Sequence, residues 1–195
     1  MTLVLASSSK PRKDLLDRLH VPYISYSPNI DESARDNEST QDLVLRLARE
    51  KAEAVSAQFP NALVIGCDQT AECEGTQLNK PHHFERAVLQ LKSVSGKKVQ
   101  FITGLCVLNT QTGQMQQHME ITDTYFKNLT LSQIENYLHR EEPYESCGSI
   151  KSEGLGIALV DKIVSNDPTS LVGMPMIALI RMLNNEGFEV LGLRF

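Results

Sequence analysis

The chain has 195 residues, of which 41% are hydrophobic and 22% are charged, a balance ordinary for a protein with a sizeable core. Its formal net charge of −5 argues against a nucleic-acid partner, because nucleic-acid-binding proteins usually carry a strongly basic surface. No apolar run approaches the length of a membrane span, and no signal peptide is visible. We therefore expect a cytoplasmic, globular protein with no membrane partner, forming a single domain over residues 1–195.

The chain begins with an apolar, strand-like run over residues 3–6, which passes into a serine-rich turn and a leucine-rich helix. Free backbone N–H groups and the helix dipole make such a helix start suited to binding an anion. Ser7 and Ser9 lie in the turn, and Arg12 and Lys13 could grip phosphate oxygens. The alternative is a helix capped by Ser9 with two solvated cations, but cations there oppose the dipole unless an anion lies between them. The segment therefore favours a phosphate site.

A short strand over residues 23–27 and a polar, proline-bearing loop over residues 28–38 are expected to precede the second helix. That helix begins at a capping-box pattern over residues 39–42 and runs to about residue 58, with an apolar stripe at helical spacing. Lys51 lies inside this stripe. A lysine that faces the body of a protein either extends its ammonium to solvent or meets an anion, and the sequence leaves both open.

Two adjacent acids, Asp31 and Glu32, lie in the loop before the second helix. Near phosphate groups, two carboxylates would suit a hard, oxygen-seeking cation such as Mg²⁺. Taken alone, the pair is better explained as a solvated acidic turn.

A compact strand is predicted over residues 63–66, and Asp68 emerges at its end. Because ligands in open α/β sheets collect beyond the carboxyl ends of strands, Asp68 is well placed for catalysis. The alternative is an aspartate in a turn or at a helix N-cap. The four cysteines lack metal-ligand spacing, and we expect reduced, partly buried thiols. Cys67 is a poor candidate nucleophile, because no partner histidine is evident.

The rest of the chain continues the alternation of helices and strands. A helix is predicted around residues 84–91, and two long strands over residues 99–108 and 114–126 are expected to form an antiparallel hairpin. A second capping-box pattern opens a helix over residues 130–140, and a proline and a glycine frame the last helix within residues 175–187. The pattern predicts an α/β fold with a mixed sheet.

Two further segments carry candidate binding residues. Lys80 follows a polar loop and precedes a proline. The run over residues 148–154 has glycine at both ends, which allows close backbone approach to a ligand, and it places Lys151 and Glu153 on one face if it is extended. A plain surface hairpin would look similar.

These segments together resemble the Maf family of nucleotide pyrophosphatases, which hydrolyse nucleoside triphosphates to the monophosphate and pyrophosphate. The resemblance covers residues 3 to about 183, and its motifs are residues 5–9 with Arg12, Asp31–Glu32, Lys51–Ala52, residues 66–69, Lys80–Pro81, residues 103–105 and Gly148–Ser149. It implies an elongated α/β fold of the Maf/ITPase type, in which helices flank a curved, mixed sheet and two lobes surround a nucleotide cleft. It also implies a small-molecule nucleotide substrate and a homodimer.

The resemblance further implies roles for individual residues. Asp68 matches the family's general base, which takes a proton from the water that attacks the α-phosphorus. The residues expected to bind substrate are Ser7, Ser9, Arg12, Lys13, Glu32, Lys51, Lys80 and Lys151. A divalent cation, Mg²⁺ or Mn²⁺, is expected on Asp68 or Glu32. In an alternative assignment, Asp68 is a metal ligand and the base is Glu32 or another metal-bound water.

Within the family, Gln69 and residues 152–154 look like the branch that acts on 7-methyl-GTP, whereas the dTTP/UTP branch typically carries Thr and Gln at positions 69 and 153. A carboxylate such as Glu153 would favour a guanine made cationic by N7-methylation. Pro11 departs from the pattern, since relatives in this branch have a Trp that could stack on the base. The alternatives are a dTTP/UTP pyrophosphatase and a non-catalytic, nucleotide-binding regulator of cell division. Retention of the acids and lysines favours the enzyme.

Overall fold

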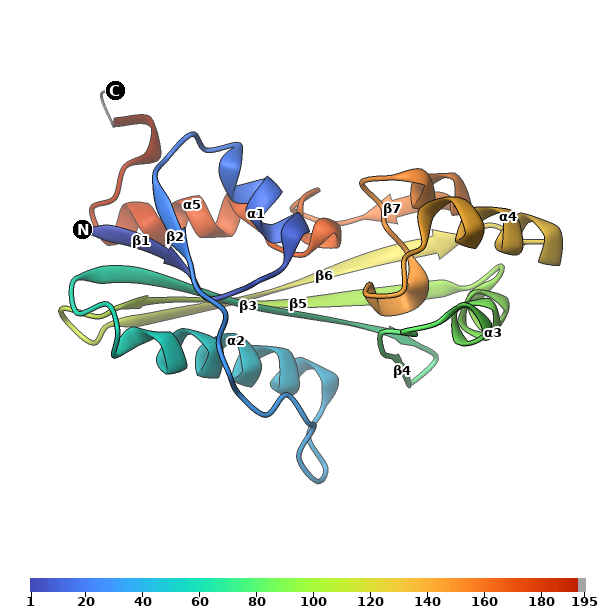
Figure 1. Ribbon diagram of the computed structural model, residues 1–195, viewed down its shortest axis with the longest axis horizontal. Helices are drawn as coiled ribbons and strands as arrows, with labels where there is room; N and C mark the ends of the chain where they lie inside the picture. Colours follow the sequence, from blue (N-terminus) through green and yellow to red (C-terminus); the bar gives the residue numbers. More distant parts are fainter. Residues whose placement is uncertain (193–195) are drawn as a thin grey trace. The chain divides into compact units, whose positions relative to one another are not determined.

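The computed structural model describes residues 1–192 and has the expected mixed α/β fold (Figure 1). The strands are β1 (Thr2–Leu5), β2 (Tyr23–Ser25), β3 (Ala62–Cys73), β4 (Thr76–Leu78), β5 (Lys98–Asn109), β6 (Met115–Phe126) and β7 (Val160–Val164). The helices are α1 (Lys10–Asp17), α2 (Thr40–Ser56), α3 (Phe84–Val94), α4 (Leu131–Glu141) and α5 (Met176–Asn185). The strands form a seven-stranded sheet in the order β2-β1-β3-β5-β6-β7, with β4 paired to β3. Because β1 runs parallel to β2 and β3, whereas β4 and β7 pair antiparallel, the predicted mixed sheet is confirmed.

The chain divides into two compact units, each built from separate stretches of sequence. Unit 1 contains residues 1–68, residues 103–120 and the described residues from 167 onward, and unit 2 contains residues 69–102 and 121–166. The long strands β3, β5 and β6 contribute residues to both units.

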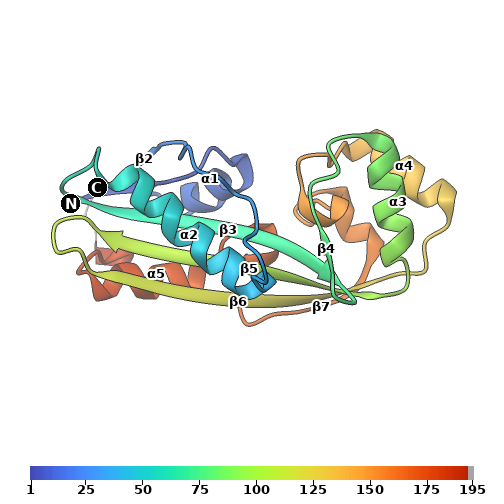
Figure 2. The same cartoon turned by 90° about the horizontal axis from the view of Figure 1, so that it is seen from below.

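In unit 1, successive strand residues alternate between two hydrophobic cores. Leu3 and Leu5 of β1 pack into a core with α1 and α5, whereas Val4 packs into a second core with α2. The same alternation separates Ile65 from Val64 in β3. Figures 1 and 2 show α2 on one face of these strands, with α1 and α5 on the other. Since both faces are covered, the strands read as continuous apolar runs in the sequence.

Helix α2 lies directly on the backbone of β3 and β5. A Cβ atom added to Gly66 would collide with the backbone carbonyl of Ala48 in α2, and one added to Gly104 would collide with another carbonyl of the same helix. The helix begins at the predicted cap, where Oγ of Ser39 accepts a 3.1 Å hydrogen bond from the N–H of Asp42. Two glycines and a serine cap thus fix where α2 lies and where it starts.

In unit 2, helices α3 and α4 pack against each other. The predicted capping box of α4 is confirmed, because Oγ1 of Thr130 accepts from the N–H of Gln133 while the Gln133 side chain accepts from the N–H of Thr130. None of the helices in the part of the chain that the structure describes is both long and apolar enough to cross a membrane.

Two strands differ from their predicted bounds. Strand β2 ends at Ser25 rather than at residue 27. Strand β3 is much longer than the predicted residues 63–66, so Asp68 lies inside the strand and not beyond its end. The polar residues from Asp68 to Thr70 interrupt the apolar run in the sequence, although the backbone continues as a strand to Cys73. Strand β1, the parallel neighbour of β3, ends before β3 does, since its last paired residue, Leu5, lies opposite Ile65.

Candidate active site

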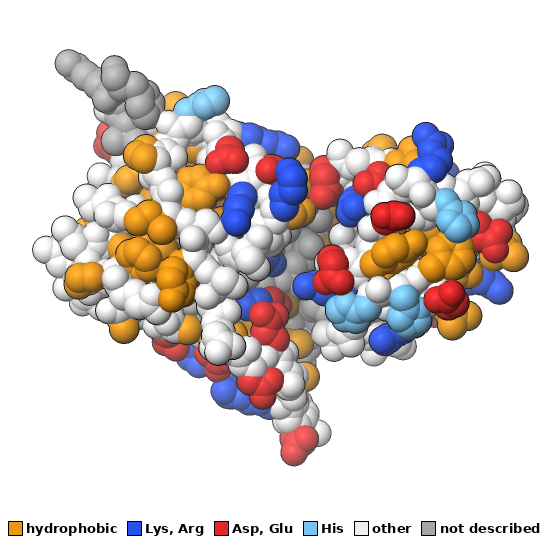
Figure 3. All heavy atoms as spheres, in the orientation of Figure 1, with side chains coloured by type: hydrophobic (Ala, Val, Ile, Leu, Met, Phe, Trp, Pro, Cys, Tyr) orange, Lys and Arg blue, Asp and Glu red, His pale blue; other side chains and the backbone are white. Residues whose placement is uncertain are grey.

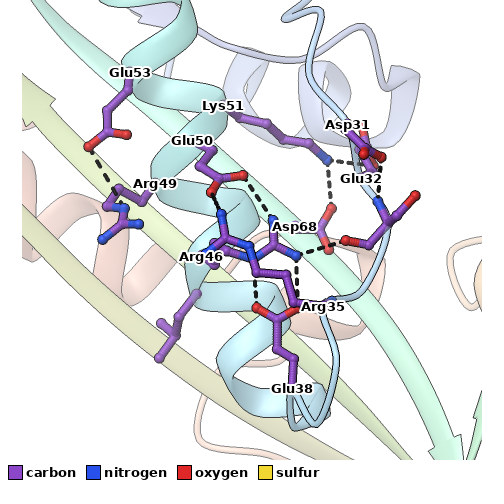
Figure 4. A network of polar contacts seen from close by, with 12 residues as sticks. Asp31, Glu32, Arg35, Glu38, Arg46, Arg49, Glu50, Lys51, Glu53 and Asp68 are labelled. Carbon is purple, nitrogen blue, oxygen red and sulfur yellow. Dashed lines mark hydrogen bonds and ion pairs between the residues drawn. The ribbon is translucent and has the colours of Figure 1, made fainter.

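The carboxylates of Asp68 and Glu32 converge on the ammonium of Lys51 (Figure 4). The Nζ atom of Lys51 donates to Oδ1 of Asp68 at 2.6 Å and lies 3.0 Å from Oε2 of Glu32. The side chains of Lys51 and Asp68 are 6% and 11% exposed, whereas that of Glu32 is 57% exposed. Of the two possibilities that the sequence leaves for Lys51, the structure therefore shows the anion partner: a buried cation joins a buried acid to an exposed one.

Strand alternation explains why Asp68 faces helix α2. Val64 packs into the core that β3 shares with α2, and the backbone at Gly66 touches the same helix. Because successive side chains of a strand point to opposite faces, Asp68 is the next residue on that face. Lys51 lies on α2 and is buried with it, so the two side chains meet at the junction of strand and helix.

Arg46 ties the loop that carries Glu32 to helix α2 (Figure 4). Its Nε and Nη2 atoms donate to the two carboxylate oxygens of Glu38 at 2.6 and 2.8 Å, and its Nη1 donates to Glu50 at 2.9 Å. The Nη2 atom also donates to the backbone carbonyl of Ser33 at 2.9 Å. Hydrogen bonds from the guanidinium lower the pKa of Glu38 to about 2.

Sequence reasoning missed this cluster. The spacing of Arg46 and Glu50, four residues apart on one helix, is a signal for an ion pair. The bidentate contact with Glu38 has no sequence signal, because it depends on how the loop folds back onto the helix.

The serine-rich turn leads into α1 as predicted. Ser9 occupies the N-cap position, and its N–H donates to Oγ of the buried Ser7 at 3.1 Å. The Nε atom of Arg12 donates to the backbone carbonyl of Gly173 at 3.0 Å, which anchors this side chain, and Lys13 is partly buried. The first turn of α1, which is fully described, contains no acidic residue. The helix start thus keeps the basic character expected of an anion site.

The charged candidates Lys80, Lys151 and Glu153 belong to unit 2, where the two lysines have different acidic partners. The Nζ atom of Lys80 lies 3.9 Å from Oε2 of Glu145. The Nζ atom of Lys151 donates to the backbone carbonyl of Glu141 at 2.8 Å and lies 3.6 Å from its Oε1. Glu153 is exposed. Within unit 2, the structure therefore does not gather these charged residues around one atom as it does in unit 1.

The condition under which Lys151 and Glu153 would share one face, an extended run over residues 148–154, is not met. The segment begins in a 3₁₀ turn over Cys147–Ser149, in which Gly148 has a φ of +66°, and it continues into a second turn. Because residues 152–154 form a turn, Lys151 and Glu153 do not share a face by strand alternation.

Two of the candidate specificity residues lie in different units. Gln69 of unit 2 accepts a weak hydrogen bond from Sγ of Cys147 at 3.7 Å, a contact that sequence reasoning did not anticipate. Pro11 lies in the first turn of α1 in unit 1.

The cysteines and acids decide what kinds of chemistry the described residues can support. The Sγ atom of Cys67 donates to the carbonyl of Gly173 at 3.1 Å, and burial raises the pKa of this thiol, which opposes a nucleophilic role.

Among residues 1–192, no group of three or more His, Cys, Asp or Glu side chains is arranged to hold a metal ion. Asp68 and Glu32 nevertheless fit Mg²⁺, which is often held by one or two carboxylates together with substrate phosphates.

Surface charge is mixed. On the face drawn in Figure 3, acidic and basic side chains of the described residues are interspersed. This mixture differs from the basic stripe that marks many nucleic-acid-binding surfaces.

The fold and the acid–lysine cluster define an α/β protein whose polar centre combines two carboxylates with a buried ammonium. The chain matches the family described as "Maf-like protein" over residues 2–186, and it belongs to this family, as its motifs indicate. It is 48% identical over 190 residues to "7-methyl-GTP pyrophosphatase" of Colwellia psychrerythraea, an alignment that covers 97% of this chain and 95% of the relative.

Other relatives with the same name are similar over comparable lengths. The protein of Pseudomonas syringae pv. syringae is 48% identical and that of Methylobacillus flagellatus is 47% identical, each over 97% of this chain and 98% of the relative. The solved structure of the Staphylococcus aureus Ham1 protein aligns with a TM-score of 0.45 and 13% identity, over 66% of this chain and 73% of that one.

Proposed function

We propose that the protein hydrolyses a nucleoside triphosphate, 7-methyl-GTP or a related modified nucleotide, to the monophosphate and pyrophosphate. The observation that carries the proposal is the buried ammonium of Lys51 between the carboxylates of Asp68 and Glu32. Near-complete alignment with relatives named 7-methyl-GTP pyrophosphatase supports the same reaction and substrate.

In the proposed reaction, Asp68 takes a proton from a water molecule whose oxygen attacks the α-phosphorus. The bond between the α-phosphorus and the bridging oxygen breaks, and pyrophosphate leaves with the bonding electrons. The ammonium of Lys51, 2.6 Å from Oδ1 of Asp68, holds this carboxylate in place by a charge-assisted hydrogen bond. Arg12 and Lys13, at the start of α1, are suited to holding phosphate oxygens. Catalysis would then rest on positioning and electrostatics.

A divalent cation, Mg²⁺ or Mn²⁺, is part of the proposal. Asp68 or Glu32 would hold it together with phosphate oxygens, since both carboxylates reach the same lysine nitrogen and each has a second oxygen. When bound, such an ion neutralises charge that develops on phosphate oxygens. The assignment of Asp68 as a metal ligand rather than as the base remains the alternative.

For the residues of unit 2 and for Pro11, the proposed roles follow from the family resemblance. Lys80 and Lys151 are proposed to bind the phosphate chain, and Gln69 and Glu153 to select the base. Pro11 offers less stacking surface than a Trp, so charge recognition by Glu153 would carry more of the selection. A cytoplasmic location and a homodimer are proposed on the same basis.

The proposal is tested with purified protein, Mg²⁺ and a panel of triphosphates: 7-methyl-GTP, GTP, dTTP and UTP. We expect equimolar release of monophosphate and pyrophosphate, fastest from 7-methyl-GTP. If dTTP or UTP is hydrolysed fastest, the proposed substrate is wrong, whereas the proposed reaction stands. Binding without pyrophosphate release from any of them would favour a nucleotide-binding regulator and contradict the proposal.

A further inference from the structure

We propose that Arg46 is a positioning residue, which holds the loop over residues 31–38 against α2 so that the carboxylate of Glu32 reaches Lys51. The inference rests on the proposed function, because it concerns the same acid–lysine cluster. It assigns a role to a residue outside that cluster, and all the residues concerned belong to unit 1.

The side chain of Glu32 does not hold its own position. Its side chain is 57% exposed, and its ion pair with Lys51 joins it to the protein at 3.0 Å. An ion pair with one exposed partner orders that partner only weakly, because solvent screens the exposed charge and the long side chain loses rotamer freedom. The position of Glu32 therefore depends on the backbone of its loop.

Arg46 fixes the backbone of this loop one residue away from Glu32. Its Nη2 atom donates to the carbonyl of Ser33 at 2.9 Å, directly after Glu32. The same guanidinium grips both oxygens of Glu38, at the other end of the loop, and the side chains of Arg46 and Glu38 are only 8% and 9% exposed. A planar guanidinium that bonds in several directions from a buried place is a rigid anchor.

Arg46 and Lys51 share one rigid element, helix α2. Both project from α2, so a loop fastened to Arg46 is fastened relative to the ammonium that Glu32 must meet. Arg35 adds an outer contact from the loop to the same helix, since its Nη2 donates to Glu50 at 2.9 Å. Figure 4 shows the loop side chains reaching α2 at these points.

The experiment is a double-mutant cycle on pyrophosphate release. Arg46→Lys keeps the charge but cannot reproduce the bidentate contact and the bond to Ser33 together. We expect it to lower kcat/KM by about 10-fold or more, because small misplacements of an active-site group have effects of that size. In a Glu32→Gln background the same change should lower kcat/KM by less than about 2-fold, since the group that Arg46 positions is already absent.

Two controls separate positioning from general stability. In a Lys80→Gln background, Arg46→Lys should keep its full effect. Arg49→Lys is the matched substitution on the same helix, at a residue that pairs with Glu53 at 3.7 Å, and it should leave kcat/KM within about 2-fold of wild type. If Arg46→Lys does not fold, Glu38→Gln weakens the same contact from the loop side and should show the same coupling to Glu32.

Hydrogen exchange provides a readout that does not need activity. Amides of residues 31–38 should exchange faster in Arg46→Lys than in wild type or Arg49→Lys, while α2 stays protected. Unchanged exchange in this loop overturns the inference whatever the activity. Faster exchange with additive effects of Arg46→Lys and Glu32→Gln also overturns it. If the amides of residues 31–38 exchange faster in Arg46→Lys but the wild-type protein releases no pyrophosphate, the anchoring role is supported and the proposed function fails.

Discussion

At the scale of single residues, the central feature is a buried lysine whose charge is matched by two acids. Lys51 and Asp68 are both buried and lie 2.6 Å apart, and each ion depends on the other, because an isolated charge away from water is strongly unfavourable. The sequence predicted a lysine facing the protein body, from its place in an apolar stripe. It could not predict the partners, which come from a strand and a loop distant along the chain.

This dependence can be measured as stability. Lys51→Met should lower the free energy of unfolding by about 3 kcal/mol at neutral pH, because the carboxylate of Asp68 is left buried without its cation. Adding Asp68→Asn should restore more than half of that loss. Urea denaturation of Lys51→Met, Asp68→Asn and the double variant measures both effects, with Lys13→Met as a control for losing a lysine. Additive losses in the double variant would show that the two residues are not energetically paired.

Base selection by Glu153 is a second residue-scale prediction. Glu153→Gln should reduce the preference for 7-methyl-GTP over GTP in kcat/KM by about 5- to 150-fold, because the neutral amide supplies no charge to attract the methylated base. Glu135→Gln, on α4 in the same unit, is the control. An unchanged ratio would remove Glu153 from substrate selection and leave the pyrophosphatase assignment intact.

At the scale of elements, the sequence predicted helices better than strands. The cap and apolar stripe of α2 and the capping box of α4 are local signals, and the structure has both helices. The extent of β3 was missed, because the buried polar residues from Asp68 onward do not look like strand from their pattern alone. The motif glycines Gly66 and Gly104 have a structural explanation that the sequence did not show, since α2 lies on their backbone.

The packing of α2 on β3 predicts a severe effect of one methyl group. Gly66→Ala should lower the free energy of unfolding by about 3 kcal/mol or more, because the new Cβ meets helix backbone that cannot move aside. Gly187→Ala is the control: it has open space around it and a φ of +75°, so only backbone strain of about 1–2 kcal/mol is expected. Thermal or urea unfolding compares them. Equal losses would mean that α2 does not press on Gly66.

At the scale of the whole molecule, the order of the motifs predicted the family, and the family model confirms it over residues 2–186. The α/β class and mixed sheet followed from the alternation of helical and strand-like segments. Two parts of the site lay beyond sequence reasoning. The contacts of Arg46 with the loop over residues 31–38 depend on tertiary folding. The turn at Gly148 depends on a positive φ that many glycines do not adopt.

Removal of divalent cations should separate activity from folding across the molecule. Excess EDTA should abolish pyrophosphate release, and added Mg²⁺ should restore it. The midpoint of thermal unfolding should shift little, because the described residues contain no cluster of metal ligands on which the fold could depend. Full activity in excess chelator would contradict a metal-assisted reaction, and a large drop in the midpoint would indicate a structural metal instead.

The role of Asp68 as general base is tested by the turnover of Asp68→Asn on 7-methyl-GTP, with Asp161→Asn, an exposed aspartate on strand β7, as the matched control. Loss of a general base typically lowers kcat by about 10²–10⁴-fold, and the variant should remain folded, because Lys51 keeps its contact with Glu32. We expect a loss of that size for Asp68→Asn and turnover near wild type for Asp161→Asn. A folded Asp68→Asn protein that releases pyrophosphate at close to the wild-type rate would rule out Asp68 as the general base.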